Sequence, residues 1–324
     1  MASLKEIKSR IASVRNTQKI TSAMRMVASA KLHHTQGMTE AFLRYKDELE
    51  RIVGSLQTLP SPSLKGGSSI SANELETIEQ SIYSSPAGEA GEGSGSLLIP
   101  ISSNSGLCGA FNSNMGKATL SRIQELEQMG KQVHLLPIGK KIAHELRKTE
   151  RELNTDFVQL LDKIGKNNDI TGVSALVAYA IELYQHKEID EVEFIYHHFK
   201  SMGSQVIQVD SLQLTVNSSM RADDQQPDDS QLSTLNSQLS TYLTEPSPEE
   251  LLTSLFPRLL NAKVYGILLD SLTSEHAARM LAMQTADDNA NDLLKELTLL
   301  YNKTRQQSIT NELIDIMSGK IGEH

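Results

Sequence analysis

The residues with the clearest potential for chemistry stand together in the segment from Ser102 to Gly109, SSNSGLCG. The segment follows an apolar run and precedes a helical pattern, and such a turn can hold a phosphate on the amides at the helix start. Its glycines, however, have the spacing Gly-x-x-Gly, which is neither the dinucleotide fingerprint nor the phosphate loop that ends in Gly-Lys-Ser/Thr. We therefore interpret the segment as a tight structural turn and keep nucleotide binding as the alternative.

The cysteine and histidine residues offer little for catalysis or metal binding. Cys108 is the only cysteine, which excludes an internal disulfide, and no histidine stands near it in the sequence to activate its thiol. We expect a partly buried structural thiol. Two adjacent pairs, His33-His34 and His197-His198, would diverge by about 100° on a helix or point to opposite faces of a strand. Neither pair can supply two ligands to one metal, and we expect these histidines at the surface.

Two charged features of the sequence could serve as binding groups: a pair of aspartate dipeptides and one arginine. Asp223-Asp224 and Asp228-Asp229 lie in a Gln- and Ser-rich stretch without the ligand spacing of a cation loop, so we interpret them as a solvated acidic loop. Arg279 stands among alanines and methionines of a helical pattern. A charge in such surroundings needs an acidic or carbonyl partner on another subunit, or else lies along the helix with its head group in water.

Composition narrows the class of protein and of partner. The chain has 324 residues and a formal net charge of −9, with 4% aromatic residues and no tryptophan. So few aromatic residues argue against a surface that stacks nucleic-acid bases. The first 34 residues are nevertheless basic, and residues 217–254 are acidic, which favours an acidic protein partner for the basic stretch. No apolar run reaches the roughly 18 residues of a membrane span, and we expect the mature chain to start at or near Met1.

The chain ends have the pattern of long helices. Residues 1–58 contain no proline, and Leu59-Pro60-Ser61-Pro62 follows, which predicts one helix of about 85 Å. Residues 248–319 show a second helical pattern, opened by Ser247 as N-cap and Pro248 at the first position. Pro257 is expected to kink this helix or to move its start.

The middle of the chain has a different period. Apolar runs predict strands over residues 97–102, 133–139, 192–199 and 205–214, and helical spacing predicts helices over 112–129, 140–153 and 171–187. This βαβα order predicts an open, mostly parallel α/β sheet. We expect five regions: a shaft helix (1–59), a flexible loop with a possible short helix over 71–83 (60–96), an α/β foot domain (97–216), an acidic loop (217–247) and a second shaft helix (248–324).

The two long helices are predicted to form an antiparallel coiled coil that other subunits enclose. Leu4, Ile7, Ile11 and Val14 form one apolar stripe, but beyond residue 19 apolar and small residues spread around most of the circumference. The last turns, with Ile309, Leu313, Ile316 and Met317 among them, behave in the same way. Because a helix that is apolar nearly all round is buried nearly all round, two helices alone do not suffice.

Three segments then resemble one known family. The run from Ile7 to Leu32, IKSRIASVRNTQKITSAMRMVASAKL, is similar to the opening helix of the gamma subunit, the central shaft of the rotary proton-translocating ATP synthase. Residues 103–114, SNSGLCGAFNSN, resemble its middle signature, and residues 274–291 with 301–319 resemble its C-terminal one. Lys320 in place of a small alanine, the long loop over 60–96 and Pro257 depart from the pattern. Because it has no second cysteine, the sequence resembles the bacterial members of the family rather than the plastid members, which carry a redox-regulated cysteine pair.

The resemblance implies a non-catalytic subunit with no cofactor and no metal. Its implied partners are the alpha and beta subunits of the catalytic head, the epsilon subunit and the membrane rotor ring, at the cytoplasmic face of the cell membrane, with no nucleic acid and no bilayer insertion. The residues implied as contacts with the head are Met24, Lys31, Arg279, Arg305, Gln306 and Thr310, and those facing the rotor ring are Tyr242 and Glu245, with Thr244 in place of the usual aromatic.

Two alternatives remain from the residues themselves. One is a phosphate- or nucleotide-binding α/β protein with a helical oligomerisation tail, which requires a ligand at the turn over residues 102–109. The other is a free-standing coiled-coil scaffold, which predicts a well-behaved homodimer rather than a chain that aggregates without its enclosing subunits.

Overall fold

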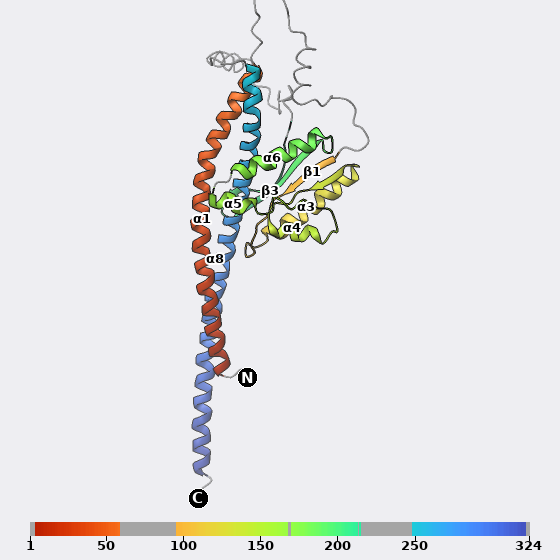
Figure 1. Ribbon diagram of the computed structural model, residues 1–324. Coiled ribbons are helices and arrows are strands. Elements are labelled where there is room, and N and C mark those ends of the chain that lie inside the picture. Colours follow the sequence, from red (N-terminus) through yellow and green to blue (C-terminus); the bar gives the residue numbers. More distant parts are fainter. Residues whose placement is uncertain (1–3, 59–94, 168–169, 213, 215–247, 322–324) are drawn as a thin grey trace, which may run out of the picture. The chain divides into compact units, whose positions relative to one another are not determined.

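The structure is a computed structural model that describes residues 4–58, 95–167, 170–212, 214 and 248–321 (Figure 1). The chain divides into two compact units, which are described separately. The first unit takes its residues from Met1–His33, Leu107–Gly109 and His276–His324, and the second from His34–Gly106 and Ala110–Glu275. The expected acidic loop, the possible helix over 71–83 and the pair Tyr242 and Glu245 lie outside the described residues.

Two long helices contribute residues to both units. Helix α1 spans Leu4–Thr58 and helix α8 spans Pro248–Ile321, which confirms the two long terminal helices that the sequence predicts. Pro257 lies inside α8, and the helix starts at Pro248, so of the two effects expected of Pro257, a kink or a later start, the later start does not occur. A proline removes only one backbone hydrogen bond of a helix. Phe256, Leu259 and Leu260 beside it are buried, and we attribute the persistence of the helix to their packing.

The second unit contains a four-stranded sheet in the order β2-β1-β3-β4. The strands are β1 (Gly95–Pro100), β2 (Gln132–Leu135), β3 (Glu191–Ser201) and β4 (Ser204–Leu212). Strand β1 pairs in parallel with β2 and with β3, whereas β4 pairs antiparallel with β3. The mostly parallel sheet is therefore confirmed. Strand β4 is the exception because the connection through Met202 and Gly203 is far too short for a crossover.

Four shorter helices accompany the sheet: α3 (Phe111–Gln128), α4 (Lys140–Arg147), α5 (Leu160–Asn167) and α6 (Ile170–Gln185). The helix expected over 140–153 ends at Arg147, because the chain turns at Glu150, which has a positive φ of 56°, and Leu153 then forms a parallel bridge with Leu135. Helix α5 is an element that the sequence pattern does not predict. The other helices and strands lie close to where their periodicity places them, except that β2, expected to reach residue 139, ends at Leu135.

The sheet of the second unit is covered on both faces (Figure 1). Leu97, Ile99 and Phe194 pack on one face with residues of α5, α6 and α8. Leu98 and Ile195 pack on the other face with residues of α3 and α4. Because both faces of β1 and β3 are buried, these strands read as continuous apolar runs rather than as alternating ones.

Within the second unit, α1 and α8 pack as an antiparallel pair. The rings of Phe42 and Tyr265 lie 4.7 Å apart, and Leu49 and Val53 pack against Leu259. The hydroxyls of Thr39 and Thr273 are 3.4 Å apart. Aromatic and aliphatic contacts therefore hold this part of the pair, together with the sheet packed beside it.

Candidate functional surface

The helical pair of the first unit is held by polar contacts one heptad apart. Gln18 Nε2 donates to Asn291 Oδ1 at 2.7 Å, and the guanidinium of Arg25 donates to Gln284 Oε1. A step of seven residues in α1 is thus matched by a step of seven in α8, as in an antiparallel coiled coil. Continued at this register, Leu4 lies opposite Arg305. Among the described residues, the end of α8 therefore continues past α1 as a single helix (Figure 1).

The first unit buries small residues and exposes large apolar ones. Ala28 and Ala277 are buried with Ile7, Leu32 and Met283. On α1, by contrast, Ile20, Met26 and Val27 are 57–62% exposed. The end of α8 exposes a series of large apolar side chains, Leu299, Leu300, Ile309, Leu313, Ile314, Ile316 and Met317, which reach 71% exposure. Soluble monomers rarely expose a continuous apolar surface of this length, and such a surface marks a protein interface.

The expected contact residues divide into two groups along the helices. Met24 and Arg279 are half-buried and Lys31 is exposed. Arg305, Gln306 and Thr310 are all exposed, and Thr310 Oγ1 donates to the backbone oxygen of Gln306 at 2.9 Å. At ~1.5 Å per residue, Arg305 lies about 39 Å along α8 from Arg279. The structure therefore places these residues as two separate patches.

The patch of Met24, Lys31 and Arg279 has a positive electrostatic field. His276 on α8 is buried, and burial, followed by the charges of Arg279 and Lys31, lowers the pKa of its ring to about 4. Two of the expected contact residues, one from each helix, are thus brought close to the same imidazole. The field favours an anionic group on whatever binds here.

Sequence reasoning missed the polar layer between the two helices. Asp287 is 8% exposed and lies 3.9 Å from the guanidinium of Arg25, and Gln284 Nε2 donates to both carboxylate oxygens of Asp288 at 3.0 Å. The seven-residue spacing of Gln18 with Arg25, and of Gln284 with Asn291, is the signal that could have revealed it. A polar layer of this kind is typical of positions that fix register in a coiled coil.

The turn over residues 102–109 uses its polar groups internally. The first amides of α4 are all engaged: Lys140 N donates to Asn104 Oδ1 at 2.9 Å, Lys141 N to Ser103 O at 3.2 Å, and Ile142 N to Ser102 Oγ at 2.9 Å. These are the donors that a phosphate at the start of α4 would need. Ser103 N in turn donates to Asn112 Oδ1 at 3.1 Å. The polar groups of Ser102, Ser103 and Asn104 are therefore used within the fold, whereas α3, the helix that follows the turn in the sequence, starts after Ala110 without a side-chain cap.

The cysteine and histidines fall into different environments. Cys108 is buried, in agreement with a structural thiol, and His33, His34 and His198 are exposed, in agreement with surface histidines. His197, however, is only 2% exposed, so the expectation for it is wrong. It stands on β3, which is covered on both faces, and its ring stacks on Phe111 with centroids 4.0 Å apart. Burial lowers the pKa of His197 to about 4.

Among the described residues there is neither a candidate metal cluster nor a helix that could span a membrane. No three His, Cys, Asp or Glu side chains in these parts of the chain are grouped so that they could hold a metal ion. None of the described helices is both long and apolar enough to cross a membrane.

Comparison with known proteins points to one family. The chain matches the family model described as ATP synthase over residues 3–320. An ATP synthase gamma chain from Parabacteroides distasonis is 44% identical over 320 residues, which cover 98% of each chain. An ATP synthase gamma chain from Rhodospirillum rubrum is 35% identical over 321 residues, covering 98% of this chain and 99% of the relative.

Solved structures share the fold. A chain of the Euglena gracilis mitochondrial ATP synthase, solved as OSCP, F1 and c-ring in rotational state 3, aligns with a TM-score of 0.59 at 18% identity, covering 99% of this chain and 94% of that chain. A chain from the rotor of the same enzyme in rotational state 1 aligns with a TM-score of 0.54 at 19% identity, covering 94% and 98%. At these identities the likeness concerns the fold alone.

Proposed function

Because the chain belongs to the ATP synthase gamma chain family, we infer that it is the non-catalytic central rotor shaft of an ATP synthase. Its helical pair turns inside the ring of alpha and beta subunits, and a membrane rotor ring drives that rotation. The shaft thereby couples proton-driven rotation to ATP synthesis, or ATP hydrolysis to the reverse rotation.

The observation that carries this proposal is the apolar end of α8. Ile309, Leu313 and Ile314 are about half exposed, and Ile316 and Met317 are 66% and 67% exposed, on a helix that has passed the end of α1. A single helix that exposes large apolar groups over about half of its circumference requires an enclosing partner in water. A ring of subunits around the shaft supplies that enclosure, whereas a two-stranded scaffold does not.

We propose that the two patches of the first unit contact the head at different heights. Met24, Lys31 and Arg279 form the lower contact, where the positive field suits acidic side chains of the catalytic subunits. Arg305, Gln306 and Thr310 form the upper contact, near the end of the shaft. Because the two helices present different side chains in each direction, each catalytic subunit meets a different face, and rotation changes these faces in turn.

The remaining partners belong to the foot. In this proposal residues 97–216 form the foot, residues 1–59 and 248–324 form the shaft, and residues 60–96 and 217–247 connect them. Tyr242 and Glu245 face the rotor ring, and the epsilon subunit binds the same end. The complex is peripheral at the cytoplasmic face of the cell membrane, and the chain itself does not insert into the bilayer.

A pull-down from membranes tests the assignment. The tagged chain should recover the alpha and beta subunits together with the rotor ring. The variant Leu313→Glu/Ile316→Glu places two carboxylates on the enclosed end and should lose most of the alpha and beta subunits while retaining the ring. Thr298→Glu/Asn302→Glu is the matched control, since it adds the same charge at exposed polar positions of α8. Equal recovery of the head by both variants would remove the support that the end of α8 provides.

A second measurement addresses the nucleotide-binding alternative. The purified chain should show no ATPase activity, and isothermal titration with ATP and with ADP should give no heat of binding. Turnover that persists after removal of every other subunit would contradict the non-catalytic role.

A further inference from the structure

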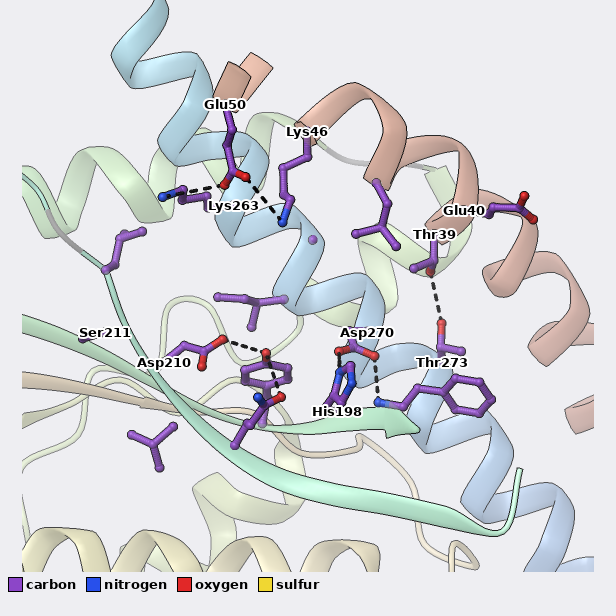
Figure 2. A pocket seen from close by; sticks show the side chains of 18 of the residues that line it. Thr39, Glu40, Lys46, Glu50, His198, Asp210, Ser211, Lys263, Asp270 and Thr273 are labelled. Atoms are coloured by element: carbon purple, nitrogen blue, oxygen red, sulfur yellow. Dashed lines mark hydrogen bonds and ion pairs between the residues drawn. The ribbon is translucent and has the colours of Figure 1, made fainter. Parts of the chain in front are cut away.

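A groove in the second unit lies between the edge of the sheet and the long helices. It has a volume of about 840 Å³ and is lined by residues of α1, β3, β4 and α8, all of them within that unit. Figure 2 shows Asp210 and Ser211 on the strand side, Lys46 and Glu50 on the helix side, and Asp270 on the floor. The groove is independent of the helical surface proposed to contact the head.

The charged groups of the groove have an excess of carboxylates. Four carboxylates line it against two ammonium groups, and the six side chains are Glu40, Glu50, Asp210, Asp270, Lys46 and Lys263. Both lysines have partners on α1: Lys263 Nζ lies 3.7 Å from Glu50, and Lys46 Nζ lies 3.8 Å from Asp47 and 4.0 Å from Glu50. Glu40 pairs with Arg44 on the exposed side of α1. Asp210 and Asp270 are therefore not paired with these lysines.

Neutral or weakly basic groups of the same unit serve these two aspartates. Tyr196 donates its hydroxyl to Asp210 Oδ2 at 2.7 Å, and burial followed by the charges of Asp210 and Asp270 raises the pKa of Tyr196. Asp270 accepts the backbone N–H of Phe199 at 2.8 Å and lies 2.6 Å from His198 Nδ1. Within the described residues, no lysine or arginine forms an ion pair with either aspartate. Asp210 is half-buried, and an ionised carboxylate of that kind can accept further hydrogen bonds.

The strand that borders the groove is an open edge. Among the described strands, β4 is last in the order β2-β1-β3-β4 and pairs only with β3. Its sequence, SQVIQVDSL, has no lysine, proline or glycine, the residues with which proteins usually protect an edge, and Val206 and Val209 are each 45% exposed. An extended chain can therefore pair with β4 through its backbone.

We propose that this groove binds an extended, basic segment of another chain, which pairs with β4 and places an arginine or lysine side chain against Asp210 and Asp270. The negative lining selects the charge of the segment, and the open edge selects its extended conformation. A guanidinium suits the site best, because it can bond both carboxylates through its planar fork.

Charge also decides against the nearest alternative occupant. Residues 215–247 of this chain follow β4 directly and could reach its edge, but they contain Asp223, Asp224, Asp228, Asp229 and Glu245 against the single base Arg221. The acidic residues of this segment are repelled by the carboxylates of the groove, and its uncharged part, residues 230–244, has no cation to offer Asp210 and Asp270. The occupant is therefore assigned to a partner chain.

Photo-crosslinking in intact cells tests the proposal. A benzophenone amino acid in place of Ser211, which lines the groove, should crosslink to a segment of another chain that contains lysine or arginine. The double variant Asp210→Asn/Asp270→Asn should lower the yield about tenfold, as expected for loss of charge-assisted hydrogen bonds. The control Asp156→Asn/Asp162→Asn removes the same charge from exposed positions outside the groove and should leave the yield unchanged.

A second measurement does not depend on correct folding of the double variant. With the unsubstituted groove, added hexa-arginine peptide should compete with the crosslink in membranes from these cells, and hexa-glutamate should not. A crosslink to residues 215–247 of the same chain, to a segment without basic residues or to nothing would overturn the proposal, as would indifference to hexa-arginine. None of these results depends on rotation, so they leave the shaft assignment to the pull-down.

Discussion

Substitutions at Met24 and at Thr310 should disturb the contact between the shaft and the head to different degrees. Met24 is half-buried on α1, whereas Thr310 is exposed and uses its hydroxyl within its own helix. The first therefore stands where an added charge has to find a partner, and the second where a lost hydroxyl is replaced by water.

This difference predicts unequal effects on coupling. Met24→Lys places an ammonium at the lower contact with the head, where it either stays unpaired at a cost of several kcal/mol or captures a carboxylate that must be released at each step. Thr310→Ala removes one hydrogen bond worth about 1 kcal/mol. Proton pumping per ATP hydrolysed in membranes should fall clearly for Met24→Lys and little for Thr310→Ala. Normal ratios in both would mean that this face of α1 is not enclosed.

His197 predicts a pH dependence of stability. Its pKa in the folded chain, about 4, lies below the usual 6.5. Between these two pH values the imidazole is therefore protonated in the unfolded chain and neutral in the folded chain. The contribution of His197 to the free energy of unfolding should therefore be fully present above pH 6.5. It should be lost as the pH falls from 6.5 to 4, which lowers the free energy of unfolding by as much as about 3 kcal/mol.

The variant His197→Phe isolates this contribution, because it retains a ring against Phe111 and cannot titrate. Urea unfolding from pH 7 to 4 should show a shallower loss of stability than in the unsubstituted chain. His34→Gln, at an exposed position, is the control and should leave the slope as it was. Identical slopes for all three proteins would exclude His197 as the source.

At the scale of elements, the start of α4 depends on one close approach of the backbone. Gly139 has φ +109°, and a Cβ there would lie 2.1 Å from the carbonyl oxygen of Ser102. This approach allows Ser102, Ser103 and Asn104 to accept the first amides of α4. The turn after β1 therefore caps the start of α4, which follows β2 in the chain.

The matched pair Gly139→Ala and Gly130→Ala tests this account. Gly130 also has a positive φ of +77°, but a Cβ there meets nothing within 4 Å. Gly130→Ala should cost about 1 kcal/mol from backbone strain alone, and Gly139→Ala should cost clearly more, because backbone has to move. Chemical denaturation measures both. Equal costs would show that the contact with Ser102 relaxes freely.

At the scale of the whole molecule, torque is proposed to pass through the helices and not through the Ser- and Gly-rich segment after α1. Residues 61–94, which exclude Gly95 and Ser96 because these belong to β1, have a composition that cannot pack a core. Replacement by a short Gly-Ser linker should leave assembly and ATP-driven proton pumping near their normal values. If assembly fails, the segment is a binding element. A linker of unchanged length and Gly-Ser composition separates the effect of length from that of sequence.

Much of the architecture follows from the sequence because it depends on neighbours along the chain. The absence of proline and the helical period predict α1, and short apolar runs bounded by turns predict β1 and β3. The large apolar residues in the last turns of α8 likewise predict the exposed apolar surface that the structure displays. Helix formation and strand formation are local enough for such patterns to be read directly.

Other features arise only where distant residues meet. The burial of His197 depends on Phe111 and on the helices that cover β3, and the layer of Arg25 with Gln284 depends on the register of two helices some 260 residues apart. The groove beside β4 needs α1, α8 and the sheet edge at once. One-dimensional periodicity holds no information on which faces oppose each other, so the environment of these side chains was decided by tertiary packing.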